Sequence, residues 1–303
     1  MNKMQSILIT GGTGLLGKYL TDALVIRGHT VRHLSRKPGK STAIKTFLWD
    51  IEQGTIDPEC IVGVDTIVHL AGEGIADKRW TAERKKLLIE SRTKSIALIY
   101  KLLETTPHTV KNVVSASGAG YYSDRGDEVM TESSLPAKDF LGECCVLWEK
   151  AVDEGTGLSL RVVKFRTGVV LTRDGGALPL LAMPVKLFVG SPMGNGKAWV
   201  PWIHWRDVVD MYILGIENQK LDGVYNMVAP NPVTNKQLTK AIAKQLHKPL
   251  WAPNVPAFAL IMLLGEMSIV VLGSTKASSA KIEAAGFEFS FPTVEGALGD
   301  IYG

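Results

Sequence analysis

Residues 10–17 read TGGTGLLG. This run follows a short β-rich segment, residues 6–10, and precedes residues with helical spacing, so it marks a strand–turn–helix unit. The G-x-x-G-x-x-G spacing is a variant of a dinucleotide fingerprint, in which the glycines permit a tight turn, close approach of a pyrophosphate, and close helix packing. Free N–H groups at the start of the helix attract phosphate. Unless the run is only a structural turn, the predicted dinucleotide contacts are Gly11, Thr13, Gly14, Leu15, Leu16 and Gly17.

The residues after the second predicted strand, residues 30–34, indicate which dinucleotide is bound. Chains that bind NAD carry an acidic residue near this point, which hydrogen-bonds the ribose. Here the sequence is Ser35-Arg36-Lys37. Arg36 can form a fork onto a 2′-phosphate and Ser35 can donate a hydrogen bond. The segment therefore predicts NADP(H), with a solvated basic loop as the alternative.

Two further loops are expected to line the same crevice at the carboxyl ends of the strands. Leu70, Ala71 and Gly72 follow the predicted strand 65–70, and their small size would let a cofactor lie close. Asp50, after Trp49, is placed to contact the adenine of the cofactor. The alternative is that these two residues only pack within the protein.

Strands and helices alternate through the first half of the chain, with strands expected at 6–10, 30–34, 65–70, 110–115 and 158–165, and helices at 18–27, 81–104 and 139–153. This alternation predicts an α/β fold, a Rossmann-type doubly wound parallel sheet with a smaller carboxyl-terminal lobe. The predicted division is 1–168 for the NADP-binding domain, with a return of the chain around 203–228. Residues 169–202 and 229–303 then form the carboxyl-terminal lobe.

Two stretches of that lobe invite separate expectations. Glycine and proline are dense over 175–201, which predicts loops. Residues 258–272 are strongly apolar but shorter than the ~20 residues that a bilayer requires. They predict a buried helix, with contact at a membrane surface as the alternative.

The composition excludes several classes of protein. Of 303 residues, 46% are hydrophobic and 21% charged, as in ordinary globular proteins. A net charge of +4, without basic runs interleaved with aromatics, argues against nucleic acid as a partner. Six histidines show no ligand spacing, so no metal is expected. An odd count of three cysteines and no secretory signal predict a cytoplasmic protein.

Further motifs carry a family resemblance: LWD at 48–50, ADKRW at 76–80, ESR at 90–92, GYY at 120–122 and RTGVVL at 166–171. With TGGTGLLG, they resemble the extended short-chain dehydrogenase/reductases and nucleotide-sugar epimerases. The closest likeness is to an atypical "epimerase family" subgroup, with a carboxyl-terminal domain of unknown function. Some of its members are described as cell-division inhibitors of the SulA type. The resemblance covers nearly the whole chain.

The resemblance implies further contacts and partners. Arg92, Arg166 and Val170 join the implied NADP contacts, although Arg92 could instead form a surface salt bridge. A small-molecule substrate of unknown identity would lie between the cofactor and the second lobe. By analogy, the helices at 81–104 and 139–153 suit a homodimer.

The implied chemistry departs from that of the relatives, which use a Tyr-x-x-x-Lys pair on the helix after the fifth strand. The aligned pair here is Phe140 with Cys144, or Leu141 with Cys145, and neither can perform acid–base catalysis. The replacement candidates are Ser117, Tyr121, Tyr122 and His204.

Each replacement candidate has an alternative. A tyrosine could supply a proton if Arg166 lowered its pKa, or Tyr121 and Tyr122 pack as a lid. His204 is a candidate acid or base, or a structural histidine bonded near Asp207. Two functions therefore stay open: an NADP(H)-dependent oxidoreductase or epimerase with a non-standard proton donor, and a regulatory protein that binds NADP(H) without efficient turnover.

Overall fold

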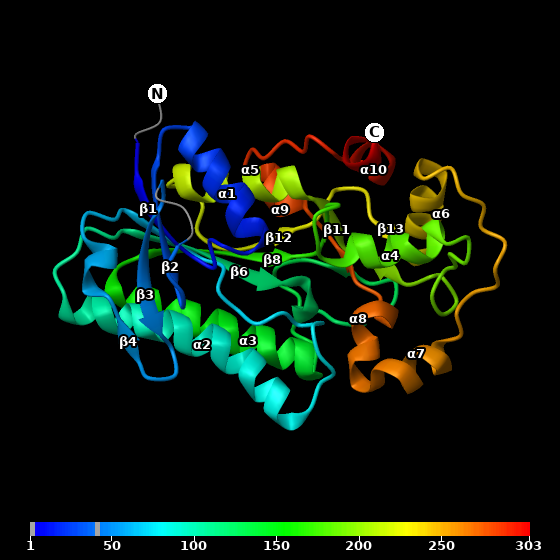
Figure 1. The fold of residues 1–303 in the computed structure, drawn as a ribbon, viewed down its shortest axis with the longest axis horizontal. Helices are drawn as coiled ribbons and strands as arrows, with labels where there is room; N and C mark the ends of the chain where they lie inside the picture. The colour runs from blue at the N-terminus through cyan, green and yellow to red at the C-terminus, as the bar shows by residue number, and fades with distance from the viewer. Residues whose placement is uncertain (1–3, 40–42) are drawn as a thin grey trace.

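A central eight-stranded sheet organises the computed structural model, which describes residues 4–39 and 43–303 (Figure 1). Its order is β12-β8-β6-β5-β1-β2-β3-β4, and every neighbouring pair is parallel except β3 with β4. The strands are β1 (Ser6–Thr10), β2 (Thr30–Ser35), β3 (Lys45–Asp50), β4 (Thr55–Ile56), β5 (Thr66–His69), β6 (Asn112–Gly118), β8 (Arg161–Thr167) and β12 (Gly223–Met227). The predicted α/β fold class is confirmed. Strand order reverses between β1 and β5, where doubly wound sheets bind ligands.

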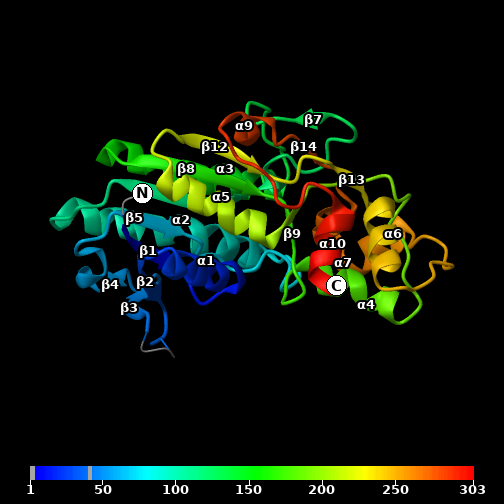
Figure 2. The same ribbon diagram turned by 90° about the horizontal axis from the view of Figure 1, so that it is seen from above.

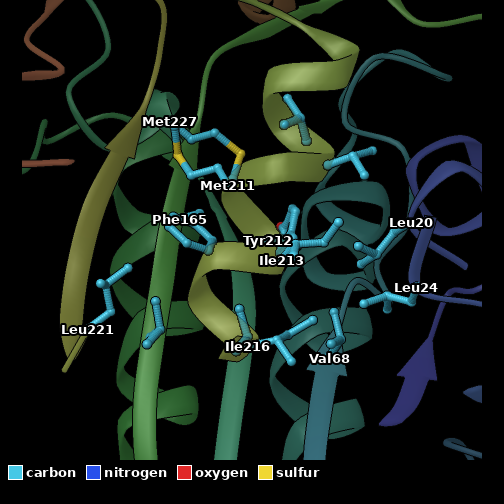
Figure 3. Packing of buried hydrophobic residues seen from close by; sticks show 14 of the residues in the cluster. Leu20, Leu24, Val68, Phe165, Met211, Tyr212, Ile213, Ile216, Leu221 and Met227 are labelled. Atoms are coloured by element: carbon cyan, nitrogen blue, oxygen red, sulfur yellow. The ribbon is translucent and has the colours of Figure 1, made fainter. Parts of the chain in front are cut away.

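Helices cover both faces of this sheet. α1 (Leu15–Ile26) and α5 (Trp205–Glu217) lie on one face, and α2 (Ala82–Thr105) and α3 (Phe140–Asp153) on the other. Successive residues of a strand point to opposite faces. Ile7 and Ile9 therefore join the core beneath α1 and α5, whereas Leu8 joins the core beneath α2 and α3. Figure 3 shows the first core, with Phe165 of β8 facing Tyr212 of α5.

A smaller lobe lies beyond the carboxyl ends of the strands (Figure 2). Its core joins α4 (Ala177–Lys186), α6 (Asn235–Gln245) and α10 (Val294–Tyr302) around Trp202. The short strands pair as β9 (Val169–Leu171) with β11 (Trp202–His204), β10 (Trp199–Val200) with β13 (Val233–Thr234), and β7 (Val129–Met130) with β14 (Lys276–Ala277). The remaining helices are α7 (Ala257–Leu264), α8 (Ile269–Leu272), α9 (Ala280–Ala284), and the 3-10 turns η1 (Pro58–Ile61), η2 (Ala119–Tyr121), η3 (Glu154–Leu158) and η4 (Gly265–Ser268). After β11, the chain returns to the large sheet through α5 and β12, while the predicted domain limits stay a prediction.

The predicted buried helix at 258–272 is wrong. Gly265, with φ +61°, ends α7, and the chain continues through η4 into α8. Phe258 is 67% exposed and Met262 76% exposed, and neither α7 nor α8 has a buried residue. Among the described residues, no helix is long and apolar enough to cross a membrane.

The prediction of loops across 175–201 is also wrong in part, because the helix α4 forms within this range. Pro179 lies in the first turn of α4, where a backbone N–H has no intrahelical partner to lose. Leu178, Ala182 and Val185 are buried in the lobe core. Tertiary packing therefore outweighs the local signal of glycine and proline.

Two helical glycines give a matched test of packing between α5 and the sheet. A Cβ on Gly215 would lie 3.0 Å from Phe165 and 3.2 Å from Val114, whereas a Cβ on Gly299 of α10 would meet nothing within 4 Å. We expect Gly215→Ala to destabilise the protein by about 1–3 kcal/mol through overpacking. Gly299→Ala should stabilise it by up to about 1 kcal/mol through helix propensity. Urea denaturation measures both changes, and a stabilising Gly215→Ala would contradict the packing of α5.

Candidate functional site

The glycine turn lies between β1 and α1 and is in close contact with the loop after β5. Gly11 has φ +70°, and a Cβ there would lie 3.0 Å from the carbonyl carbon and oxygen of Leu70. A Cβ on Gly17 would lie 2.3 Å from the carbonyl oxygen of Gly11. Gly14 is the N-cap of α1 and supplies no side-chain cap, so the first N–H groups of the helix have no side-chain acceptor. Thr13 and Gly14 are exposed, and Leu15 and Leu16 are half-buried.

Two residues not predicted from the sequence hold this turn. The Thr10 hydroxyl accepts hydrogen bonds from the backbone N–H groups of Leu70 and Ala71, both at 3.1 Å. The His33 ring lies directly beneath Gly12, at 2.4 Å from the position of a Cβ there. His33 also hydrogen-bonds Thr21 of α1 at 2.8 Å, and burial lowers its pKa, which favours the neutral ring. A buried histidine at the end of a strand carries no motif that could have identified it.

Arg36 extends from the end of β2 toward the loop after β5. Its guanidinium is 3.2 Å from Glu73, and its side chain is 73% exposed. The second oxygen of Glu73 accepts from Arg84 at 3.2 Å, and Arg84 lowers the pKa of Glu73. The Ser35 hydroxyl accepts from the N–H of Lys37. Ser35, Arg36 and Lys37 therefore form an accessible cationic corner beside the glycine turn.

Two predicted contacts are engaged within the protein. Asp50 accepts from the N–H groups of Glu52 and Gln53, at 2.9 and 3.0 Å, and so closes the β3–β4 turn. Arg92 is buried, donates to the carbonyls of Leu88 and Glu73, and stacks 5.0 Å from Trp148. Burial lowers the pKa of Arg92. The surface salt bridge considered for Arg92 is wrong, because its partners are carbonyls and an aromatic ring.

Gly72 is exposed and lies directly against Arg92. A Cβ on Gly72 would lie 3.2 Å from the Arg92 guanidinium carbon. Trp49, beside Asp50, is buried in the core beneath α2. Val170, in β9, is half-buried and packs against the core beneath α5.

A buried ion pair fills the space behind the end of β6. Arg166 of β8 donates to both carboxylate oxygens of Glu149, at 2.8 and 2.9 Å, and Ser117 donates to the same carboxylate at 2.7 Å. All three side chains are at least nine-tenths buried. The Ser117 proton is thus directed at Glu149.

Tyr121 and Tyr122 differ in burial and in the hydrogen bonds of their hydroxyls. Tyr122 is fully buried, donates to Asn226 at 2.6 Å, and accepts from Arg166 at 2.9 Å. Burial outweighs Arg166 and raises the pKa of Tyr122 to about 12, so the expected lowering is wrong for this residue. Tyr121 is half-buried, with its ring stacked 3.3 Å from the Arg166 guanidinium carbon. Its hydroxyl has no hydrogen-bond partner within 4–39 and 43–303.

The orientation of α3 decides which pair faces the crevice. Leu141 packs against Gly120, and the Cys145 thiol approaches the carbonyl of Gly118 at 3.6 Å, so both face the loop after β6. Phe140 and Cys144 instead pack toward α2, with Trp80 and Leu88. Of the two pairs considered for the Tyr-x-x-x-Lys positions, Leu141 with Cys145 is therefore the one that faces this loop. Burial raises the pKa of Cys145 to about 12, so the thiol stays protonated.

His204 lies in the second lobe and is fully buried. Its Nδ1 accepts from the N–H of Arg206 and so caps α5, while Nε2 is 3.3 Å from Asp300. Asp207, the partner considered from the sequence, instead accepts from the N–H groups of Ser290 and Phe291. Burial lowers the pKa of His204 to about 4. This geometry is that of a neutral helix cap.

Comparison with known proteins was made at the level of family, sequence and structure. Residues 7–140 match the NAD dependent epimerase/dehydratase family, and residues 255–301 match a domain of unknown function, DUF1731. The epimerase family protein YfhF of Bacillus subtilis is 35% identical over 98% of this chain and 97% of its own length.

Two solved structures are similar over nearly the whole chain. The human epimerase family protein SDR39U1 with NADPH is 31% identical, with TM-score 0.87 over 98% of this chain and 99% of that chain. A nucleoside-diphosphate sugar epimerase from Corynebacterium glutamicum is 32% identical, with TM-score 0.82 over 99% of this chain and 59% of that chain.

The buried His204 predicts a specific loss of stability in acid. Its folded pKa of about 4 lies below the ordinary value of 6.5, so between these values the unfolded chain takes up a proton that the folded chain refuses. Stability is therefore complete above pH 6.5 and falls as the pH drops, by roughly 2 kcal/mol at pH 5 for this residue. His204→Asn retains a capping acceptor and should remove that part of the loss.

Denaturant titrations at pH 6.5 and pH 5 measure the difference. The matched control is His247→Asn, because His247 is exposed and its φ of +53° is a conformation that asparagine tolerates. An equal acid loss in wild type and His204→Asn would show that His204 titrates freely in the folded protein.

Proposed function

The chain belongs to the NAD dependent epimerase/dehydratase family, and from this membership we propose that it is an NADP(H)-dependent oxidoreductase or epimerase acting on a small carbonyl or hydroxyl compound. The observation that carries the choice of NADP(H) is the accessible Arg36 beside the glycine turn. The similarity to a human protein solved with NADPH supports it.

The residues present fit a dinucleotide phosphate. Glycine is required at Gly11 and Gly17, because a Cβ at either would collide with backbone, and the exposed Gly14 leaves the start of α1 open to an anion. Arg36 offers a planar fork to a 2′-phosphate, for which it must exchange its contact with Glu73. Lys37 adds a second cation, and Ser35, the last residue of β2, adds a hydroxyl beside both.

The other residues implied as cofactor contacts would shape the binding site rather than bind the cofactor through a charge. Leu70 and Ala71 are held by Thr10, and Gly72 brings backbone close to the crevice. Arg92, engaged with backbone carbonyls, and Asp50, engaged with a turn, would position their loops. Arg166 and Val170 likewise support the crevice from behind.

Tyr121 is the proton donor that we propose. A bound nicotinamide supplies or accepts hydride, so a protein group must move one proton at the substrate oxygen. The Tyr121 hydroxyl has no partner among the described residues, and its ring is fixed by Arg166. Ser117 and Tyr122 are each committed to a buried partner and His204 caps α5, so we assign all three to positioning.

A second function is a regulatory protein that binds NADP(H) with little turnover. Leu141 and Cys145 favour it, because neither can anchor a ribose by charge or lower a tyrosine pKa as lysine does. NADPH oxidation across a panel of aldehydes, ketones and keto-sugars, with binding measured in parallel, separates the two functions. Turnover supports the first, and tight binding without turnover across the panel favours the second.

The Arg36 assignment predicts a selective loss. Arg36→Ala should weaken NADPH binding by about tenfold or more and leave NADH binding within about twofold, because only NADPH carries the 2′-phosphate. Calorimetric titration of both cofactors measures this, with Lys45→Ala on β3 as a charge-matched control. Equal losses for NADPH and NADH would refute a 2′-phosphate contact.

The Tyr121 assignment predicts a split between catalysis and stability. On any substrate that turns over, Tyr121→Phe should lower kcat by about 10²–10⁴-fold and spare NADPH affinity and the melting curve, since the ring remains on Arg166. Tyr122→Phe should instead cost about 1–3 kcal/mol of stability, because it leaves the buried Asn226 Oδ1 without its donor and removes one acceptor from Arg166. Unchanged kcat in Tyr121→Phe would remove it as the proton donor.

A further inference from the structure

The outer end of the second lobe carries a group of exposed apolar side chains, here called the outer apolar patch: Phe188, Trp251, Phe258, Ile261, Met262 and Leu263. Trp251 is 70% exposed and Leu263 72%. Single exposed apolar residues are ordinary in soluble proteins, but a group of this size marks an interaction surface.

Two segments distant in sequence meet at this patch. The Trp251 indole donates to the carbonyl of Phe188 at 2.8 Å, and Gly194 donates to the carbonyl of Val255 at 2.8 Å. α7 begins directly after this junction. Figure 1 shows the loop between α6 and α7 forming one edge of the molecule, with α7 at its lower end.

Within the described chain α7 is only thinly covered: Ala259, Leu260 and Leu264 are half-buried, and its other side chains are exposed. Its sequence, AFALIMLL, is apolar on every face, yet none of its residues is buried. A helix that is apolar all round is expected inside a protein core or against lipid. Beyond α7, Met267 of η4 and Ile269 of α8 pack against Trp80 and Phe140. This contact anchors the segment that follows α7, while most side chains of α7 itself stay exposed.

The segments that bear the patch are also uniformly cationic. Residues 175–202 and 229–265 contain no Asp or Glu, but they contain Lys186, Lys197, Lys236, Lys240, Lys244 and Lys248. Lys236, Lys240 and Lys244 recur every four residues on the exposed face of α6. Lys248 lies 4.1 Å over the Phe188 ring, so this cation adjoins the apolar patch directly. None of the six forms an ion pair with a residue in 4–39 or 43–303.

We propose that the outer apolar patch docks on an anionic lipid bilayer. Aromatic and aliphatic side chains enter the boundary between headgroups and acyl chains, and adjacent lysines meet lipid phosphates. The protein would lie on the membrane surface through α7, whose eight residues are far too few to span it. A two-fold dimer through this patch would bring the same lysines face to face, which opposes a second copy as the occupant.

Vesicle co-sedimentation of the full chain, without NADPH, tests the proposal independently of the proposed function. We expect binding to vesicles of equal parts phosphatidylcholine and phosphatidylglycerol, at least about tenfold stronger than to phosphatidylcholine alone, and weakening as salt rises. Vesicles with brominated acyl chains should quench tryptophan fluorescence in wild type, and Trp251→Phe should remove most of that quenching.

Matched variants distinguish binding through the outer apolar patch from nonspecific hydrophobic or electrostatic adsorption to vesicles. Phe258→Ser/Met262→Ser and Lys240→Glu/Lys244→Glu should each lower vesicle partition by about tenfold or more. The controls are Ile26→Ser, another exposed apolar residue, and Lys101→Glu/Lys111→Glu, a pair of exposed lysines near the opposite ends of the strands. All of these positions are exposed, so thermal melting should change little in every variant.

Three outcomes would overturn the proposal. The first is no vesicle binding at low salt, and the second is equal losses in patch and control variants. The third is a stable dimer by light scattering that Phe258→Ser/Met262→Ser converts to monomer, which would make a second copy the occupant.

Discussion

The backbone contact between the glycine turn and α1 is the constraint on which the rest of the molecule depends. At Gly17, the helix passes so close to the carbonyl of Gly11 that a Cβ would lie 2.3 Å from it. Any side chain there would push α1 off β1 and away from α5, with which it shares the core that contains Leu20, Leu24 and Tyr212. The same approach opens the start of α1 toward the crevice. Packing of the first core and binding of an anion therefore require the same residue.

A second constraint explains why most of the hydroxyl groups near the end of β6 are engaged in hydrogen bonds. The Arg166–Glu149 pair is buried, and breaking a buried pair leaves an uncompensated charge at a cost of about 3–5 kcal/mol. Ser117 donates to Glu149 and Tyr122 accepts from Arg166, so their hydroxyls are committed to the fold. Only Tyr121 touches the network through its ring and keeps its hydroxyl uncommitted among the described residues. Of the hydroxyls of Ser117, Tyr121 and Tyr122, only that of Tyr121 has no partner among the described residues, which supports it as the proposed proton donor.

The sequence predicted features that local chemistry determines and missed those that packing determines. The strand–turn–helix at residues 10–17 and the helices at 81–104 and 139–153 follow from spacing and capping, and the structure contains them. α4 and α5 were not predicted, because their burial depends on distant partners such as Phe165 and Trp202. The apolar run at 258–272 predicts a buried helix or a membrane-surface contact, because hydropathy and length cannot tell a buried surface from an exposed one. His33 and Thr10 hold the site by contacts that no motif encodes.

The small net charge of the whole chain conceals a separation of charge between its two parts. Six of the 34 Lys and Arg residues, and none of the 30 Asp and Glu residues, fall in the two segments that carry the outer apolar patch. The remainder of the chain is therefore slightly acidic. A cationic, apolar end would orient the molecule toward an anionic surface, while its acidic remainder would be repelled from that surface. α4 and α6, which carry four of those six lysines, pack against the core of the lobe adjoining the crevice. A protein docked in this way would hold the second lobe, rather than the large sheet, at the lipid headgroups.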